Sequence, residues 1–135
     1  MANIPDEIAD DEYLYRGVTA NCYSSEHKRA SSAAFKDSGG MSVDRDGGRD
    51  CDTCVSRLCS SGKSFVAVAR FKASVPRKVG NLVLYKPIAN INPYHSEVHE
   101  SDTVLKLTGS HAHNISSACE TITTLEEAEE SSQES

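Results

Sequence analysis

The chain has 135 residues, of which 14 are basic and 20 are acidic, and its formal net charge is −6. This balance argues against a broad nucleic-acid-binding surface, which normally needs an excess of Lys and Arg. The length suits one domain with one core. The hydrophobic fraction of 38% is lower than the roughly 45–50% of typical globular domains. We therefore expect the folded part to be smaller than the whole chain.

The sequence also lacks signals for a membrane or for export. No stretch approaches the roughly 18 consecutive apolar residues that cross a bilayer. The opening MANIPDEIADDE is acidic and lacks the basic-then-apolar order of a signal peptide. These features predict a cytoplasmic protein of bacterial type with no membrane contact. In that compartment the five cysteines are expected to be reduced.

The N-terminal half predicts one strand followed by a long polar segment. Residues 1–11 are expected to form a flexible acidic lead-in. Residues 13–18, YLYRGV, have the aromatic and β-branched composition of a strand. Residues 19–50 are rich in Ser, Gly, Asp and Arg, with few side chains that could pack. A loop of this length in a small domain is usually functional or disordered.

The second half predicts one helix and two strands that pair with each other. Asp50 or Asp52 can cap a short helix around Cys51 to Cys59. Residues 64–75 and 81–88 show the composition and alternation of strands.

The remaining segments predict a polar loop, a helix and a tail. Residues 89–103 read as a loop that carries two histidines and two glutamates, and an apolar helix face follows in residues 115–122. The acidic ending at residues 125–135 is predicted to be disordered. The elements together predict one α+β domain at residues 12–124, in which a small antiparallel or mixed sheet carries one or two short helices and long polar loops.

Zinc is one candidate cofactor. Cys51 and Cys54 have C-x2-C spacing, and His95 and His99 have H-x3-H spacing. Paired spacings of this kind are typical of four-ligand zinc sites. The alternative is that the cysteines pack as small apolar side chains on a helix and the histidines are solvated.

Two further site hypotheses stay open. The segment SVDRDGGRD places Ser42, Asp44 and Asp46 at alternate positions before Gly47, as in an EF-hand loop, but Thr53 stands where the bidentate Glu should be. Asp residues that cap turns explain the same pattern. Cys51 at a helix start could also be a reactive thiol if a histidine lies beside it.

The order Arg16, Ser42, Glu97 resembles that of small ADP-ribosyl-transferring folds. The resemblance implies that the Arg binds a phosphate, the Ser positions a ribose and the Glu stabilises the reacting ribose. This chain lacks the Ser-Thr-Ser strand of that family. In the alternative, Arg16 pairs with a nearby Asp.

A longer resemblance covers residues 12 to 99. The segments YLYRGV, SSAAFKD, MSVDR and INPYHSEVH, in this order, resemble small uncharacterised bacterial proteins that share a Tyr-Arg start, a Ser-Ala-Phe-Lys/Arg-Asp segment, a Met/Leu-Ser-Val-Asp segment and an Asn-Pro-x-His segment. The group implies no activity. After His99 its members are basic, whereas this chain reads HESDTVLKL.

Two classes of function follow from these observations. In the first, the protein binds or processes a phosphate-bearing small molecule or nucleotide in a cleft lined by the polar loops. The residues expected there are Arg16, Lys36, Asp44 and Asn92 as ligand-binding groups and Ser42, His95 and Glu97 as catalytic groups. His95 is the expected acid or base, because the pKa of histidine lies near neutrality. In the second class, the protein is a non-catalytic partner-binding component of a bacterial operon. Convergence of Arg16, Ser42 and His95 in one pocket would favour the first.

Overall fold

A computed structural model describes residues 4–36, 39–60 and 65–123 of the chain. It contains eight strands and three α-helices within these residues, together with two short 3-10 helices. The strands are β1 (Tyr13–Val18), β2 (Tyr23–Ser24), β3 (Arg29–Ala30), β4 (Met41–Arg45), β5 (Ala67–Lys72), β6 (Leu82–Tyr85), β7 (His95–His99) and β8 (Glu120–Thr123). The helices are α1 (Cys51–Cys59), α2 (Ser74–Arg77) and α3 (Gly109–Ala118), with 3-10 helices η1 (Ala20–Cys22) and η2 (Ser32–Phe35).

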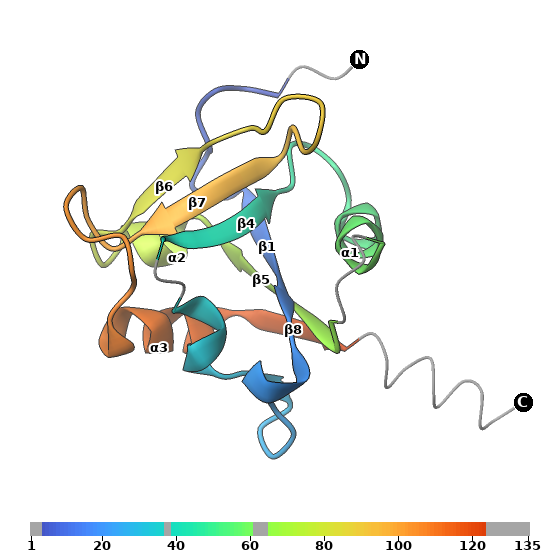
Figure 1. The fold of residues 1–135 in the computed structure, drawn as a ribbon, viewed down its shortest axis with the longest axis vertical. Coiled ribbons are helices and arrows are strands. Elements are labelled where there is room, and N and C mark those ends of the chain that lie inside the picture. The colour runs from blue at the N-terminus through green and yellow to red at the C-terminus, as the bar shows by residue number, and fades with distance from the viewer. Residues whose placement is uncertain (1–3, 37–38, 61–64, 124–135) are drawn as a thin grey trace, which may run out of the picture.

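Six of the strands form one sheet in the order β6-β7-β4-β1-β5-β8 (Figure 1). Every pairing in it is antiparallel. Strands β2 and β3 form a separate two-stranded ribbon. The predicted α+β class is therefore confirmed, and the sheet is antiparallel rather than mixed.

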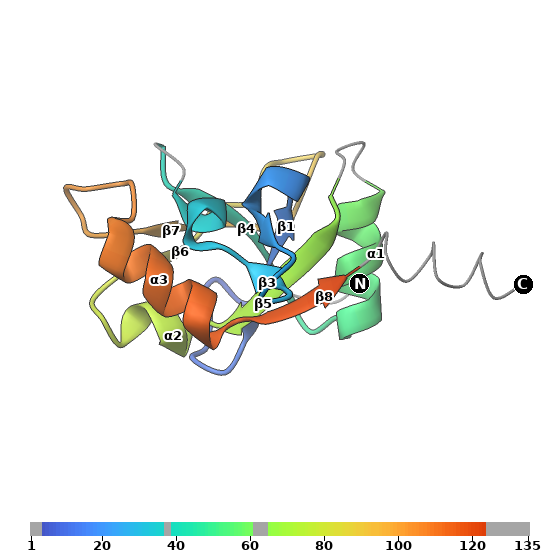
Figure 2. The ribbon, with the colours of Figure 1, turned by 90° about the horizontal axis from the view of Figure 1, so that it is seen from below.

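The two faces of the sheet carry different layers. Alternate side chains of β1 and β5 point to opposite faces, and the larger core forms on the face that bears Leu14 and Phe71. Its buried members include side chains from the sheet, η2 and α3: Leu14, Val18, Phe35, Met41, Val43, Ala69, Phe71, Val98, Ala112 and Ile115. Helix α1 packs on the other face, and Figure 2 shows α1 and α3 far apart with β5 and β8 between them.

Helix α1 forms where the sequence predicts it. The Asp50 side chain caps its start by accepting a hydrogen bond from the Thr53 amide at 2.8 Å. Cys54, Val55 and Leu58 follow the i, i+1, i+4 spacing of one helix face, and they pack against Tyr15 and Val68 of the sheet. This small second core holds α1 against β1.

The predicted pairing of residues 64–75 with residues 81–88 is wrong. Strand β5 pairs with β1 and β8, whereas β6 pairs with β7 at the opposite edge of the sheet. Helix α2 lies in the connection between β5 and β6. Between β6 and β5 in the sheet lie β1 and two strands from segments that the sequence predicts as loops.

Those strands are β4, inside the predicted loop 19–50, and β7, inside the predicted loop 89–103. Their sequences, MSVDR and HSEVH, place charged or polar side chains at most positions. The alternation of Met41 and Val43 with polar residues is short and lies in a Ser/Gly/Asp-rich segment, and β7 has Val98 as its one apolar residue, so neither segment gives a clear strand signal. In the sheet these polar groups find specific partners instead. Arg45, for example, is only 1% exposed.

The segment ahead of β1 is attached to the sheet by Arg45. The Arg45 guanidinium donates to both carboxylate oxygens of Glu12 at 2.7 Å, to the Pro5 carbonyl and to the Glu7 carbonyl. It also lies 4.5 Å from the centre of the Tyr85 ring. Ile8, in the predicted flexible lead-in, is 2% exposed.

Two further sequence-based expectations concern the C-terminal tail and membrane-spanning helices. The predicted disordered tail at residues 125–135 lies outside the described residues. Among the residues that the structure describes, none of the helices has the length and apolarity needed to cross a membrane.

The Glu12–Arg45 pair gives the first testable prediction. Glu12→Gln leaves a buried guanidinium without a counter-charge, so we expect the free energy of unfolding to fall by about 3–5 kcal/mol. Asp10→Asn is the matched control, because Asp10 pairs with Arg77 at the surface, where the Asp10 side chain is 76% exposed. This substitution should lower the free energy of unfolding by less than about 1 kcal/mol. Urea unfolding measures both.

The same pair predicts a pH dependence. Burial alone would raise the pKa of Glu12, but hydrogen bonds from Arg45 and the Gly47 amide hold it below its ordinary value of about 4.5. The stability from Glu12 is therefore complete above that ordinary value and is lost as the pH falls through the folded-state pKa. The difference in the free energy of unfolding between the wild-type protein and Glu12→Gln should therefore shrink over this acid range. A difference that stays constant with pH would contradict the ion pair.

Candidate functional site

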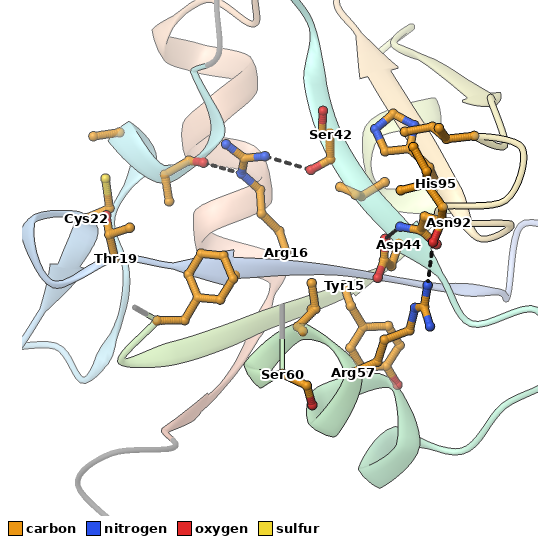
Figure 3. Close-up of a pocket in the computed structure, with 18 residues that line it drawn as sticks. Tyr15, Arg16, Thr19, Cys22, Ser42, Asp44, Arg57, Ser60, Asn92 and His95 are labelled. Atoms are coloured by element: carbon orange, nitrogen blue, oxygen red, sulfur yellow. Dashed lines mark hydrogen bonds between the residues drawn. The ribbon is translucent and has the colours of Figure 1, made fainter. Parts of the chain in front are cut away.

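A cleft opens where strands β1 and β4 separate. The two strands pair at only two positions, Leu14 with Arg45 and Tyr15 with Asp44. Beyond Tyr15, β1 continues along β5 while the rest of β4 continues along β7. The fork between them contains an open cavity of about 1090 Å³ (Figure 3). Loop residues from between β6 and β7 and the C-terminal half of α1 complete its walls.

Arg16 bridges the fork. Its Nε donates to the Ala34 carbonyl of η2 at 2.5 Å, and its Nη1 donates to the Ser42 carbonyl of β4 at 2.6 Å. Figure 3 shows the side chain extending from β1 across the gap toward β4. Both of these contacts are to backbone carbonyls. Arg16 therefore braces the cleft and also contributes a positive charge to it.

A row of polar side chains crosses the sheet beside the fork. The register places His95, Asp44, Tyr15 and Arg70 opposite one another on four neighbouring strands. Burial raises the pKa of Tyr15 to about 12, so its hydroxyl remains protonated near neutral pH. The Tyr15 hydroxyl accepts a long hydrogen bond of 3.5 Å from Arg70. Three members of this row, Tyr15, Asp44 and His95, line the cleft.

Asp44 and His95 are held in defined orientations within this row. Asp44 is 6% exposed, and its Oδ1 accepts a hydrogen bond from Nδ2 of Asn92 at 2.8 Å. His95 Nδ1 lies 3.0 Å from the Lys86 carbonyl. Because a carbonyl oxygen can only accept, this contact places the proton on Nδ1 in the neutral ring and leaves Nε2 with a lone pair.

The charged residues of the lining are unequal in number. Among the described residues they comprise two guanidinium groups, of Arg16 and Arg57, and one carboxylate, of Asp44. The cleft therefore has a positive balance in a chain whose net charge is −6. The apolar part of the lining includes Val43, Leu58, Phe65, Ile88 and Ile91.

Five of the predicted ligand-binding and catalytic residues line this cleft. They are Arg16, Ser42, Asp44, Asn92 and His95. They come from β1, β4, β7 and the loop before β7, so segments about 80 residues apart in the chain converge. The convergence of Arg16, Ser42 and His95 is the arrangement that favours a ligand-binding role.

Glu97 and Lys36 do not belong to the lining. Glu97 is paired opposite Ser42 in the sheet, but its carboxylate accepts a hydrogen bond from Nε2 of His99 at 2.8 Å. Lys36 is exposed at the end of η2, where its Nζ lies near the start of α3 at Gly109. The hydrogen bond of Glu97 is thus to His99 and not to His95, and Lys36 lies outside the described lining of the cleft.

The candidate zinc ligands are not brought together. Cys51 and Cys54 lie on α1, whereas His95 and His99 lie on β7. Four residues along a strand span about 13 Å, so the H-x3-H spacing separates the two rings here: His95 lines the cleft and His99 is buried beside Gly40. Within residues 4–36, 39–60 and 65–123, His, Cys, Asp and Glu side chains form no group of three that could hold a metal ion.

The carboxylates of the EF-hand-like segment bind the protein itself. Asp46 accepts hydrogen bonds from the backbone amides of Tyr13 and Gly48, at 3.0 and 2.8 Å. Asp44 accepts from Asn92. These contacts correspond to the alternative in which Asp side chains cap turns.

Three cleft residues carry no clear sequence signal. Arg57 is next in sequence to Leu58 of the packed face of α1, but its side chain lies at the rim of the cleft. There its Nη2 donates to the Ile91 carbonyl at 3.2 Å. Ile91 is 72% exposed, which is unusual for so apolar a side chain in a polar loop. Leu58 fits the apolar pattern of a helix face, and it contacts the small core under α1 as well as lining the cleft. Their convergence depends on how α1 docks, which local spacing does not specify.

Comparisons with known proteins assign no family to the chain. No family model matches the sequence, and no curated protein or solved structure is significantly similar to it.

The brace formed by Arg16 predicts a loss of stability when it is removed. Arg16→Ala leaves the Ala34 and Ser42 carbonyls without these donors, so we expect the free energy of unfolding to fall by about 2 kcal/mol. Arg57→Ala removes an arginine from the rim of the cleft and should change the free energy of unfolding by less than about 0.5 kcal/mol. Urea unfolding of both variants measures the difference. Equal values for the two would show that Arg16 does not brace the fork.

The cysteines of α1 predict a graded reactivity. Cys54 is fully buried, and burial raises its pKa to about 11, whereas Cys59 is exposed. Because the thiolate is the reactive form, iodoacetamide at neutral pH should alkylate Cys59 first and Cys54 only after unfolding. Mass spectrometry of timed samples measures this order. Labelling of Cys54 in the folded protein as fast as that of Cys59 would contradict the burial.

Proposed function

We propose that the fork cleft binds a small phosphate-bearing molecule of the nucleotide class. The observation that carries this proposal is the convergence of two guanidinium groups with Ser42 and His95 in one cavity of an otherwise acidic protein. Guanidinium groups form charge-assisted, often bidentate hydrogen bonds with phosphate oxygens. The cavity volume of about 1090 Å³ suits a ligand of this size.

The cationic groups have different roles in this proposal. Arg16 already donates to two carbonyls, so it supplies mainly a fixed positive field. Arg57 is exposed and makes one hydrogen bond to a carbonyl, which leaves other N–H groups for a phosphate. The exposed Ser42 adds a hydroxyl on the strand that faces Arg16.

The apolar lining supports the nucleotide class over a bare phosphate. Phe65, Leu58 and Ile91 are large apolar members of the lining, and a flat base can pack against such side chains. A simple anion would leave this surface unused. The cleft thus combines a cationic part and an apolar part, as a molecule with a phosphate and a base requires.

His95 is the group in the cleft suited to proton transfer. Its Nδ1 is held by the Lys86 carbonyl, and Nε2 of the neutral ring can accept a proton. Glu97 is engaged by His99, so an ADP-ribosyl-transferring chemistry based on Arg16, Ser42 and Glu97 would require that contact to open. We therefore assign the acid or base role to His95.

Isothermal titration calorimetry with ADP and adenosine tests the proposal. The wild-type protein should bind ADP more tightly than adenosine, because only ADP carries phosphates. Arg57→Gln should weaken ADP binding by about tenfold and leave adenosine binding unchanged. Lys36→Gln is the matched control: it removes one exposed positive charge outside the cleft and should bind ADP as the wild type does.

Three results would contradict this function. Equal binding of ADP and adenosine would show that the cleft does not recognise phosphate. An equal loss in Arg57→Gln and Lys36→Gln would show that only the overall charge matters. Failure of the wild-type protein to bind ADP at all would shift the assignment to a partner-binding role.

A further inference from the structure

The carboxylate of Asp44 is unusual among the charged groups of this protein. It is 6% exposed and lines the cleft. Buried Asp side chains are normally paired with a cation. Within the described part of the chain, no Lys, Arg or His nitrogen forms an ion pair with Asp44. A buried carboxylate without a counter-charge is costly, which marks it as a candidate for ligand recognition.

Asn92 fixes the direction of this carboxylate. The Asn92 Oδ1 accepts a hydrogen bond from the Tyr94 amide at 3.0 Å, which settles the orientation of the side-chain amide. Its Nδ2 must then donate to Oδ1 of Asp44, at 2.8 Å. Figure 3 shows Asp44 and Asn92 together beside His95, with Arg16 across the cleft next to Ser42.

The second oxygen of Asp44 has hydrogen-bonding capacity to spare. Among the described residues, no side-chain or backbone donor reaches Asp44 Oδ2. This oxygen is not fully enclosed by protein atoms, so it retains contact with the cleft. Oδ2, together with the remaining lone pair of Oδ1, can accept two further hydrogen bonds.

The donors that fit this position are neutral hydroxyl groups. A cationic ligand group is disfavoured because Arg16 and Arg57 line the same cavity. A metal ion would need more ligands than Asp44 alone supplies. Vicinal hydroxyls of a ribose provide two neutral donors, and a carboxylate that accepts from them is a recurrent means of ribose recognition.

We propose that Asp44, oriented by Asn92, binds the 2′- and 3′-hydroxyls of a ribose, so that the ligand of the cleft is a ribonucleotide. This inference rests on the proposed function of the cleft and specifies its ligand. The phosphates lie toward the guanidinium groups, and the ribose lies over Asp44. The carboxylate then selects against deoxyribonucleotides.

Calorimetry with ADP, 2′-deoxy-ADP and 3′-deoxy-ADP tests the inference. The wild-type protein should prefer ADP over each deoxy analogue by about tenfold. Asp44→Asn keeps the size of the side chain but makes it neutral, so the preference should fall to about threefold, because neutral hydrogen bonds are roughly half as strong. The same variant should bind 2′-deoxy-ADP no more weakly than the wild type, since a negative charge near the phosphates is gone.

The opposite pattern would overturn the inference. If Asp44 acts only through its charge, Asp44→Asn will strengthen binding of all three nucleotides by one factor and leave the preference intact. Asn92→Ala provides a second variant with unchanged charge. It should reduce the preference for ADP by releasing Asp44, and an unchanged preference would equally contradict the assignment. Thermal midpoints confirm that both variants are folded.

The failures of the two proposals are distinguishable. If the wild-type protein binds ADP and the deoxy analogues equally while Arg57→Gln still weakens ADP, the phosphate site stands and the ribose assignment is overturned. If the wild-type protein binds none of the three nucleotides, the proposed function fails and the ribose assignment fails with it.

Discussion

The divergence of β1 from β4, bridged by Arg16, is the constraint on which the candidate site depends. Two central strands of an antiparallel sheet normally pair along their length, and their separation leaves backbone groups without ladder partners. Arg16 compensates for part of this loss by donating to the Ser42 carbonyl of β4, and its second bond, to Ala34, ties η2 to the same point. The guanidinium thus stabilises an opening in the sheet, and the polar side chains of both strands can line it.

The opposite end of the fork is closed by ionic and backbone contacts. Arg45, paired with Leu14 in the ladder, holds Glu12 by two hydrogen bonds. Asp46 and Tyr13 exchange a backbone bond and a side-chain bond, both of 3.0 Å. The strands are therefore fixed at one end and separated at the other. This arrangement places cleft groups on a rigid base, which favours ligand recognition without a large rearrangement.

The sequence predicts the elements whose signals are local. The cap at Asp50 and the strand composition of β1 and β5 follow from short-range patterns. The strands β4 and β7 do not, because the alternation around Met41 and Val43 is short and β7 has Val98 as its one apolar residue. The buried polar residues of these strands are satisfied by partners distant in the chain, such as Glu12 for Arg45. Five residues that the sequence singles out, Arg16, Ser42, Asp44, Asn92 and His95, line the cleft, but their grouping depends on strand order, which the sequence does not specify locally.

The charges of the cleft have an apparent conflict that the ribose assignment resolves. A carboxylate in an anion-binding cavity lowers the affinity for any phosphate placed beside it. If affinity for phosphate were the only requirement, Asn at position 44 would serve better, since it keeps the bond to Asn92 without the repulsion. An unpaired carboxylate is favourable only when the ligand brings neutral donors to it. It then acts twice, by binding the hydroxyls and by repelling a ligand that enters with its phosphates reversed. Arg16 and Asp44 together would therefore determine the orientation of the bound nucleotide, not only its affinity.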